Sequence, residues 1–171
     1  CTTKTPQGIC ATAVTPDTTP PAQYPPGLIV ALDRLADPGN LGTIVRTADA
    51  MGATGLLLGE GCADPFAPKA LRSSMGSAYH LPLWQAVLTE QLPRLKEQCF
   101  TLLCGHLQGQ EQWPPVGSCC VLVIGNESRG VSEAVSGLCH KVRLPMRGKA
   151  ESLNAAVAAG IFLCELANRM P

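Results

Sequence analysis

From Leu28 to the end of the chain, short apolar runs alternate with segments of helical periodicity, and this alternation constrains the fold more than any other feature. The runs "LIVALD", "TGLLLG", "CFTLLCG" and "CCVLVIG" are apolar at consecutive positions, and helical segments such as "NLGTIVRTADAMGA" lie between them. Strands that are apolar on both faces are typical of a parallel sheet covered by helices on both sides. With 171 residues, the sequence predicts one α/β domain with a mostly parallel sheet.

A proline-dense segment, "TPDTTPPAQYPP" (residues 15–26), precedes this pattern. Proline fixes φ and lacks a backbone N–H, so the segment is neither helix nor central strand. We expect residues 1–27 to form a short strand, "GICATAV", followed by an extended connector, and residues 28–171 to form the main domain. Because the chain begins at Cys1 rather than at a methionine, we also expect a fragment of a longer chain.

Charge and cysteine content restrict the class of protein. The formal net charge is +0, so no overall field favours a nucleic acid or a membrane, but residues 128–150 are locally basic and are a candidate phosphate contact. No apolar run approaches the ~18 residues of a membrane span. The nine cysteines are odd in number and lack C-x-x-C spacing, which indicates buried free thiols in a reducing, cytoplasmic compartment, with no disulfide framework and no metal site.

Apolar residues at helical spacing predict the buried face of two helices. In the first helix the predicted stripe is Leu41, Ile44, Val45, Ala48 and Met51. Arg46 lies away from that stripe and is therefore free to face a cleft. The last helix is expected from about Ser152, with Leu153, Val157, Gly160, Ile161 and Cys164 as its buried stripe.

Common nucleotide and hydrolase motifs fail on inspection. "GEGCAD" lacks the third glycine of a dinucleotide fingerprint. "GNESRG" has the glycine spacing of a P-loop, but Val131 and Ser132 stand where lysine and serine or threonine are required. The same segment has Asn126 in place of the first glycine of a hydrolase elbow. These motifs therefore favour neither triphosphate hydrolysis nor a serine hydrolase.

Three polar clusters follow predicted strands. The first holds Asn40 and Arg46, the second holds Glu127, and the third holds Ser152 and Asn154. Strand exits are where α/β proteins gather ligand groups, so we expect the clusters to converge. Simpler explanations remain open. Asn40 or Ser152 would only cap a helix, Arg46 would only pair with Asp33 or Asp49, and Glu127 would only accept turn hydrogen bonds.

The three clusters, in this order and spacing, resemble the motifs of the SpoU (TrmH-like) RNA ribose 2′-O-methyltransferases of the SPOUT superfamily. "DPGNLGTIVRTADAMGA", "LVIGNESRGV" and "LPMRGKAESLNAAVAAG" are similar to the family's first, second and third motifs, and "PFAPKALRSSMGSAYHLPL" is also characteristic. The resemblance extends from about residue 28 to residue 168. "TPQGICATA" resembles the segment that joins many members to a separate substrate-binding domain.

The resemblance implies a C-terminal trefoil knot, bound S-adenosylmethionine (S-adenosyl-L-methionine) and a homodimer. The positions matching the family's functional polar residues are Asn40, Arg46, Glu127, Ser152 and Asn154. Those matching its cofactor pocket are Leu103, Cys104, Gly105, His106, Ile124, Gly125, Asn126, Leu144, Met146 and Leu153. The basic residues expected to contact RNA phosphates are Arg129, Arg143, Arg147 and Lys149.

The expected reaction is methyl transfer to a ribose 2′-hydroxyl, with residues 28–171 as the catalytic domain. Ribosomal RNA is favoured over transfer RNA because many members carry a separate N-terminal domain. Two other classes stay open: a non-catalytic RNA-binding protein with the same fold, and a nicotinamide-dependent dehydrogenase, which the incomplete glycine fingerprint disfavours.

Overall fold

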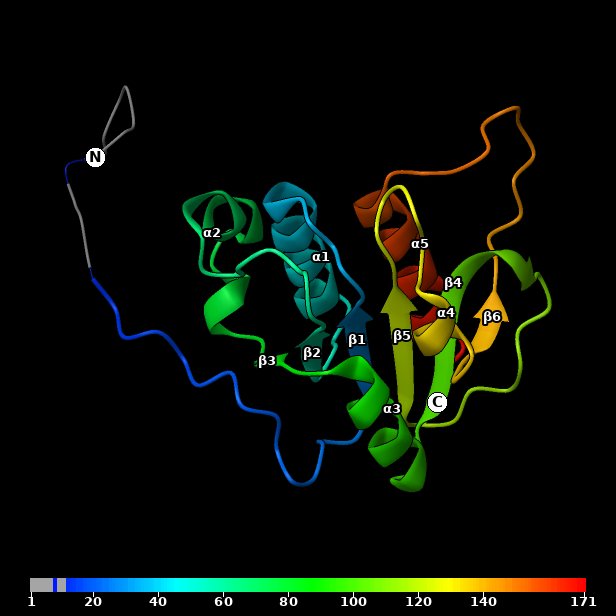
Figure 1. Ribbon diagram of the computed structural model, residues 1–171, viewed down its shortest axis with the longest axis horizontal. Helices are drawn as coiled ribbons and strands as arrows, with labels where there is room; N and C mark the ends of the chain where they lie inside the picture. The colour runs from blue at the N-terminus through cyan, green and yellow to red at the C-terminus, as the bar shows by residue number, and fades with distance from the viewer. Residues whose placement is uncertain (1–7, 9–11) are drawn as a thin grey trace.

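The computed structural model describes residue 8 and residues 12–171 (Figure 1). Residues 9–11 of the predicted N-terminal strand lie outside the described residues, and residues 12–14 are not in a strand. Among the described residues, no helix is both long enough and apolar enough to cross a bilayer.

A six-stranded sheet in the order β3-β2-β1-β5-β4-β6 forms the centre of the molecule, and every strand pair in it is parallel. The strands are β1 (Leu28–Leu32), β2 (Gly55–Leu58), β3 (Leu83–Gln85), β4 (Thr101–Gln110), β5 (Cys120–Ile124) and β6 (His140–Val142). This confirms the predicted parallel sheet. The neighbours β1 and β5 are far apart in sequence, and the carboxyl ends of such central strands form the usual ligand crevice of an open α/β sheet.

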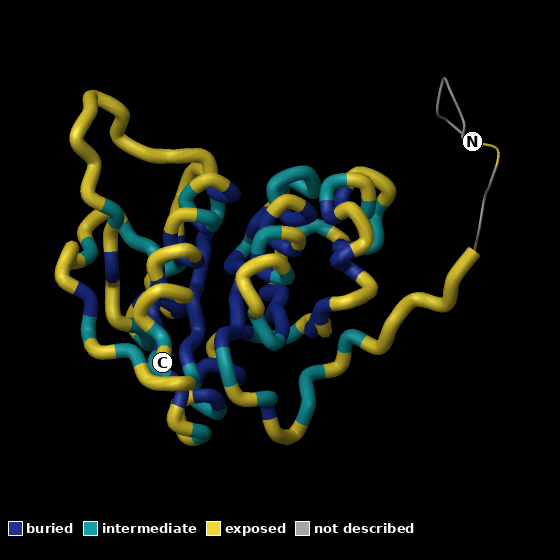
Figure 2. Tube along the Cα trace, turned by 180° about the vertical axis from the view of Figure 1, so that it is seen from behind, coloured by how far each residue is buried: buried dark blue, intermediate teal, exposed yellow. Residues whose placement is uncertain are grey.

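Helices cover both faces of this sheet (Figure 1). They are α1 (Pro38–Ala50), α2 (Pro68–Ser74), the short 3-10 helix η1 (Ser77–Tyr79), α3 (Leu88–Glu97), α4 (Glu133–Ser136) and α5 (Ala155–Ala167). Side chains alternate along β1: Val30 joins the core beneath α1 and α5, whereas Ile29 and Ala31 join the core beneath α3 and α4. The central strands β1, β2 and β5 are therefore buried on both sides, as the dark centre of Figure 2 shows.

The first helix is close to its prediction. Asp37 caps α1 by accepting a hydrogen bond from the Asn40 N–H at 2.8 Å, and Pro38 begins the helix. Leu41, Ile44, Val45 and Ala48 are buried as expected, whereas Met51 at the helix end is 39% exposed. Gly42 lets α2 approach closely, since a Cβ there would lie 2.6 Å from the Ser73 Cβ.

The predicted face of the last helix is wrong. Helix α5 begins at Ala155, not near Ser152, and its cap is Asn154, whose side chain accepts hydrogen bonds from two backbone N–H groups. The buried residues are Ala155, Ala156, Ala159, Phe162, Leu163 and Leu166. Val157 and Ile161, predicted to be buried, are 52% and 42% exposed, and Cys164 is also exposed. Because this helix is apolar almost all round, its periodicity does not identify the buried face.

The proline-dense connector is attached to the domain. The Thr18 carbonyl accepts a hydrogen bond from the Gln85 N–H at 2.8 Å, beside the edge strand β3. The buried Tyr24 donates its hydroxyl proton to Gln91 at 2.8 Å and packs edge-on against Trp84, with ring centroids 5.4 Å apart. Residues 15–26 are in no helix or strand, and these contacts hold the segment against the domain.

Candidate functional site

A cavity of about 740 Å³ opens at the carboxyl ends of β4 and β5. Its walls come from the end of β4, the loop that follows β5, residues 143–153 and the first turns of α5. Predicted cofactor residues on its wall are Gly105, His106, Ile124, Gly125, Asn126, Leu144, Met146 and Leu153. Leu103 and Cys104 do not line it, because both are fully buried further back in β4.

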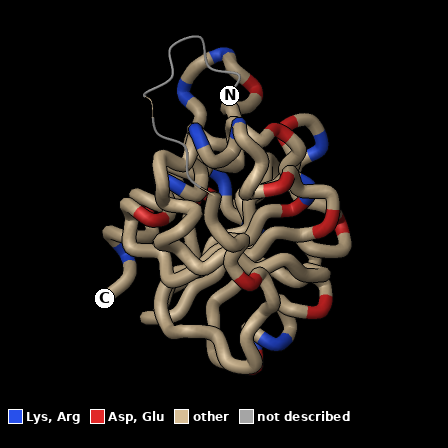
Figure 3. Tube along the Cα trace, turned by 90° about the vertical axis from the view of Figure 1, so that its left-hand side faces the viewer, with Lys and Arg blue, Asp and Glu red and all other residues tan. Residues whose placement is uncertain are grey.

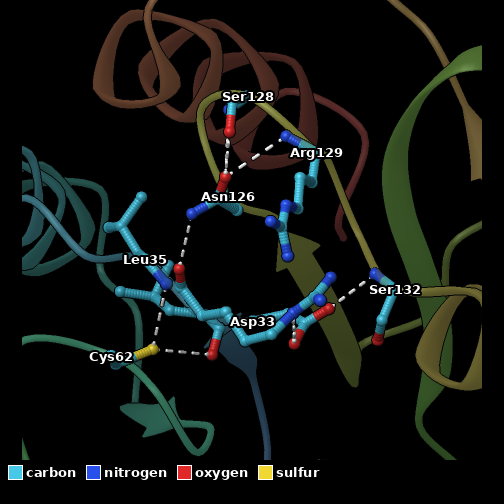
Figure 4. Close-up of polar contacts among 9 residues, drawn as sticks. Asp33, Leu35, Cys62, Asn126, Ser128, Arg129 and Ser132 are labelled. Atoms are coloured by element: carbon cyan, nitrogen blue, oxygen red, sulfur yellow. Dashed lines mark hydrogen bonds and ion pairs between the residues drawn. The ribbon is translucent and has the colours of Figure 1, made fainter.

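Asn126 shapes the loop that follows β5 (Figure 4). Its Nδ2 donates to the Arg34 carbonyl at 2.9 Å, and its Oδ1 accepts from the Ser128 N–H and hydroxyl at 3.0 and 2.9 Å. Two backbone hydrogen bonds also join Asn126 to Gly130. A Cβ on Gly125 would collide with the backbone of Gly130 and Val131. The loop that lines this side of the cavity is therefore held by its own hydrogen bonds and by close backbone packing at Gly125.

Asp33, at the end of β1, holds the far end of the same loop. Its carboxylate is buried and accepts hydrogen bonds from the Ser132 N–H at 2.6 Å and from the Arg34 Nε at 3.2 Å (Figure 4). Nearby, the Cys62 thiol donates to the Leu32 carbonyl at 3.2 Å, and burial raises the pKa of this thiol, so it keeps its proton. Residues 33 and 34 thus fix both ends of the loop between β5 and α4.

A chain of side-chain hydrogen bonds joins all three polar clusters. Asn40 Nδ2 donates to Glu127 Oε1 at 3.0 Å, and Asn154 Nδ2 donates to Asn40 Oδ1 at 3.0 Å. Asn154 Oδ1 in turn accepts from the Ala156 and Val157 N–H groups at the start of α5. Asn40 is therefore not the cap of α1, and Glu127 does more than complete a turn.

Ser152 and Arg46 have different positions. Ser152 is exposed and lines the cavity, two residues before the cap of α5, so it is not the cap. Arg46 is exposed on α1 and is not on the cavity wall. Among the described residues it makes no ion pair, because Asp33 pairs with Arg34 and Asp49 lies 3.6 Å from His80. Its charge is therefore free for a ligand.

The predicted phosphate contacts divide into two pairs. Arg129 and Arg143 line the cavity, and Arg143 is paired with Glu111 at 2.8 Å. Arg147 and Lys149 are exposed on the segment that follows β6, away from the cavity wall. All four follow the carboxyl ends of β5 and β6 along the chain.

His106 contributes a neutral wall to the cavity. Burial, and then the positive charge of Lys141, hold the pKa of the His106 imidazole below its ordinary value. Its Nδ1 accepts a hydrogen bond from the Gln108 N–H at 3.1 Å, consistent with an unprotonated nitrogen. Near pH 7 this part of the wall carries no charge.

Phe162 is a cavity residue that the sequence did not reveal. It lies on α5 and lines the cavity beside Gly105, where an added Cβ would approach its ring to 2.8 Å. One apolar residue in a helix that is apolar almost all round carries no signal of this kind.

The cysteines only partly match their prediction. Those described are free, and burial raises the pKa of the Cys120 thiol to about 12. Cys104 is buried as well, but Cys99 and Cys164 are exposed, contrary to expectation. Within the part of the chain that the structure describes, no three His, Cys, Asp or Glu side chains are grouped so as to hold a metal ion.

Together, the parallel sheet, the cavity at its carboxyl edge and the three linked clusters define an α/β domain of the SPOUT methyltransferase class. Residues 27–164 match a sequence model described as the SpoU rRNA Methylase family. This covers most of the chain, which therefore belongs to the SpoU rRNA methylase family.

Individual relatives agree. The chain is 40% identical over 144 residues to the 23S rRNA (guanosine(2553)-2′-O)-methyltransferase RlmP of Bacillus subtilis, covering 81% of this chain and 57% of the relative. An AdoMet-bound rRNA methyltransferase from Sinorhizobium meliloti superposes with a TM-score of 0.76 at 37% identity, covering 86% of this chain and 61% of that one. The AdoMet complex of the SpoU methyltransferase AviRb from Streptomyces viridochromogenes superposes with a TM-score of 0.77 at 35% identity. The match covers 86% of this chain and 59% of that one.

Two consequences follow from these matches. The expected fold class is confirmed: a parallel α/β sheet with helices on both faces, in the knotted form of the SpoU/TrmH methyltransferases. The chain also spans only 57% of the length of the Bacillus relative and 59–61% of the two solved chains.

Proposed function

We propose that residues 28–171 are the catalytic domain of an RNA 2′-O-ribose methyltransferase that uses S-adenosylmethionine and acts on ribosomal RNA. The observation that carries this proposal is the hydrogen-bonded chain from Glu127 through Asn40 to Asn154, beside a cavity at the carboxyl edge of the sheet. The family match and the rRNA methyltransferases among the relatives support the substrate class.

The cavity fits S-adenosylmethionine in size and character. A volume of about 740 Å³ falls within the range usual for small-molecule sites. Ile124, Leu144 and Leu153 offer apolar surface on its wall. The glycines at 105 and 125 let Phe162 and the backbone of Gly130 pack closely beside the cavity. When bound, S-adenosylmethionine supplies an electrophilic methyl group on a sulfonium. The neutral His106 adds no competing positive charge to this wall.

Arg46 is assigned to the RNA phosphate next to the target ribose and to its 2′-hydroxyl. A guanidinium is a permanently charged fork with a pKa above ~12, so it orients and polarises better than it accepts a proton. The hydroxyl proton leaves to phosphate or water. Positioning of this kind is worth ~7 kcal/mol or more when two reactants are well oriented.

The linked amides orient the site. Asn40 and Ser152 are assigned to hold the RNA, Asn154 to hold the loop at the start of α5, and Glu127 to fix Asn40. Arg129, Arg143, Arg147 and Lys149 are assigned to phosphates. Because phosphate contacts release counterions, RNA affinity will fall with rising salt.

We also propose that the protein works as a homodimer, joined through the exposed side of α5. Val157 and Ile161 lie one turn apart and are 52% and 42% exposed, with Leu153 (36%) at the same end of the helix. Helix α5 crosses α1 closely, since a Cβ on Gly160 would lie 3.7 Å from Thr47 Cγ2. An interface here would include the neighbourhood of Arg46, and would allow Arg46 to serve the cavity of the partner subunit.

The free cysteines fit a reducing compartment, and we propose the cytoplasm. We propose that residues 1–27 lead from a separate substrate-binding domain, with residues 18–24 docked on β3 and α3.

The test is incubation of the full-length protein with labelled S-adenosylmethionine and unmethylated ribosomal RNA transcripts. We expect label at a single ribose 2′-oxygen, mapped by resistance to alkaline cleavage. Arg46→Ala will reduce transfer at least 100-fold and leave cofactor affinity within twofold. Label on transfer RNA alone would correct the substrate, and absence of cofactor binding would overturn the proposal.

A further inference from the structure

Tyr79 is the one exposed aromatic side chain of the chain. The other tyrosine, both tryptophans and two of the three phenylalanines are at most 9% exposed, and Phe66 is partly buried. Tyr79, in contrast, is 52% exposed, and the nearby Met75 is 71% exposed. All seven aromatic residues fall within the described residues. Exposing an aromatic ring to water is unfavourable, and binding a partner against the ring would remove that cost.

The Tyr79 ring is held in place. It ends η1, where its N–H donates to the Gly76 carbonyl at 3.0 Å, and the preceding Ser77 and Ala78 are buried. The Phe66 ring supports it from one side, with centroids 6.2 Å apart. Since the backbone and one side of the ring are already fixed, the Tyr79 side chain would lose little entropy when a flat ligand binds against it.

Tyr79 and Arg46 lie on elements that pack together, η1 and α1. His80, next to Tyr79, reaches Asp49 on α1 at 3.6 Å. Asp49 is three residues beyond Arg46, which places the two ~60° apart around the helix and less than one turn apart along it. Arg46 therefore faces the side of α1 on which η1 packs.

Unpaired positive charge accompanies the ring. Within the described residues neither Arg46 nor Arg72, in the last turn of α2, forms an ion pair, whereas Lys69 is paired with Asp37. Seen from the α2 side, Lys and Arg positions gather mainly in the upper half of the molecule, toward which the strands run (Figure 3). Helices α1 and α2, which carry these two guanidinium groups, both contact η1. A fixed aromatic ring accompanied by unpaired cations is an arrangement that binds unpaired nucleotides.

We propose that Tyr79 is a stacking platform for an unpaired base of the RNA close to the methylated ribose, with Arg72 contacting a phosphate beside it. This rests on the proposed function, and it identifies the substrate as RNA that is single-stranded near the target. Stacking accepts any base, so the platform binds the strand and leaves the choice of nucleotide to other contacts.

The test uses the full-length protein with Tyr79→Ala, Tyr79→Leu and Tyr79→Phe. Leucine retains apolar volume without a ring, and phenylalanine retains the ring without the hydroxyl. We expect Ala and Leu each to weaken binding of an unmethylated ribosomal RNA transcript about tenfold and Phe less than twofold. For RNA binding, Arg72→Ala will reduce the slope of the logarithm of the binding constant against the logarithm of salt concentration by about one, which corresponds to one released ion. Tyr79→Ala will not change this slope.

The outcomes separate the two proposals. Equal RNA binding by the Ala, Leu and Phe variants overturns the platform, even if the protein methylates RNA. Tyr79-dependent binding without methyl transfer keeps the platform and overturns the proposed reaction, and absence of RNA binding by the wild type overturns both. A change in sedimentation mass with Tyr79→Ala would assign the ring to a subunit interface and also overturn the platform.

Discussion

Two walls of the cavity are built in opposite ways. Residues 125–132 are tied by Asn126, by Asp33 and by the backbone pair between Asn126 and Gly130. Residues 144–153 of the opposite wall make no hydrogen bond with any described residue, and nearly all are exposed (Figure 2). A segment with few buried contacts opens at low free energy. One wall is therefore fixed before any ligand binds, while the other is held by few contacts and is free to adjust.

A methyl group added to each wall gives the largest contrast. Gly125→Ala will destabilise the fold by about 2 kcal/mol or more, because its Cβ collides with the backbone across the loop. Cofactor affinity will fall at least 100-fold. Gly148→Ala is the matched control, since nothing lies within 4 Å of its Cβ, and its effect will stay within ~0.5 kcal/mol. Urea unfolding and calorimetric titration measure both variants, and similar costs at the two glycines would refute the contrast.

Loss of the Asp33 carboxylate is the next largest effect. Asp33→Ala leaves the Ser132 N–H without its acceptor, which we expect to cost about 2 kcal/mol in unfolding free energy and to raise the KM for the cofactor. Arg34→Ala is the control: it removes only a partly exposed ion pair and keeps the carbonyl that accepts from Asn126, so it will cost under ~1 kcal/mol. If the two variants unfold at the same urea concentration, Asp33 does not hold the loop.

In the wall formed by residues 144–153, a substitution should change cofactor affinity without changing the stability of the fold. Leu153 is already 36% exposed, so Leu153→Ala will change stability by less than ~0.5 kcal/mol. If the cofactor covers this side chain, the same variant will lose about fivefold in cofactor affinity, or ~1 kcal/mol. A stability loss as large as that of Asp33→Ala would mean that this wall, too, is built into the folded domain.

The smallest effect concerns pH. The pKa of His106 is lower in the folded protein than in the unfolded chain, so the unfolded chain binds the proton first as the pH falls below about 6.5. The free energy of unfolding therefore declines as the pH falls from about 6.5 to the folded-state pKa. Above about 6.5, His106 has no effect on it. Unfolding followed at pH 7.5 and 5.5 will show a shallower decline in His106→Gln. An equal decline in both proteins would contradict this assignment.

Sequence reasoning was successful where local chemistry and periodicity agree. The buried runs became parallel strands, and the stripe of α1 was right because polar residues occupy its other side. The order and spacing of the three clusters also identified the family. It failed on the buried face of α5, which the uniformly apolar sequence of this helix left undetermined.

The amino-acid sequence by itself determined the parallel α/β class, the polar residues that gather at one edge of the sheet and the family to which they belong. Only the tertiary structure decided that Asn40 links Glu127 to Asn154 and that Arg46 does not line the cavity of its own chain. It also decided that Tyr79 is the one aromatic side chain that is largely exposed to solvent. The reason is physical: strand and helix preferences act over neighbouring residues, whereas these contacts join positions up to 114 residues apart. Such contacts exist only once the chain has packed.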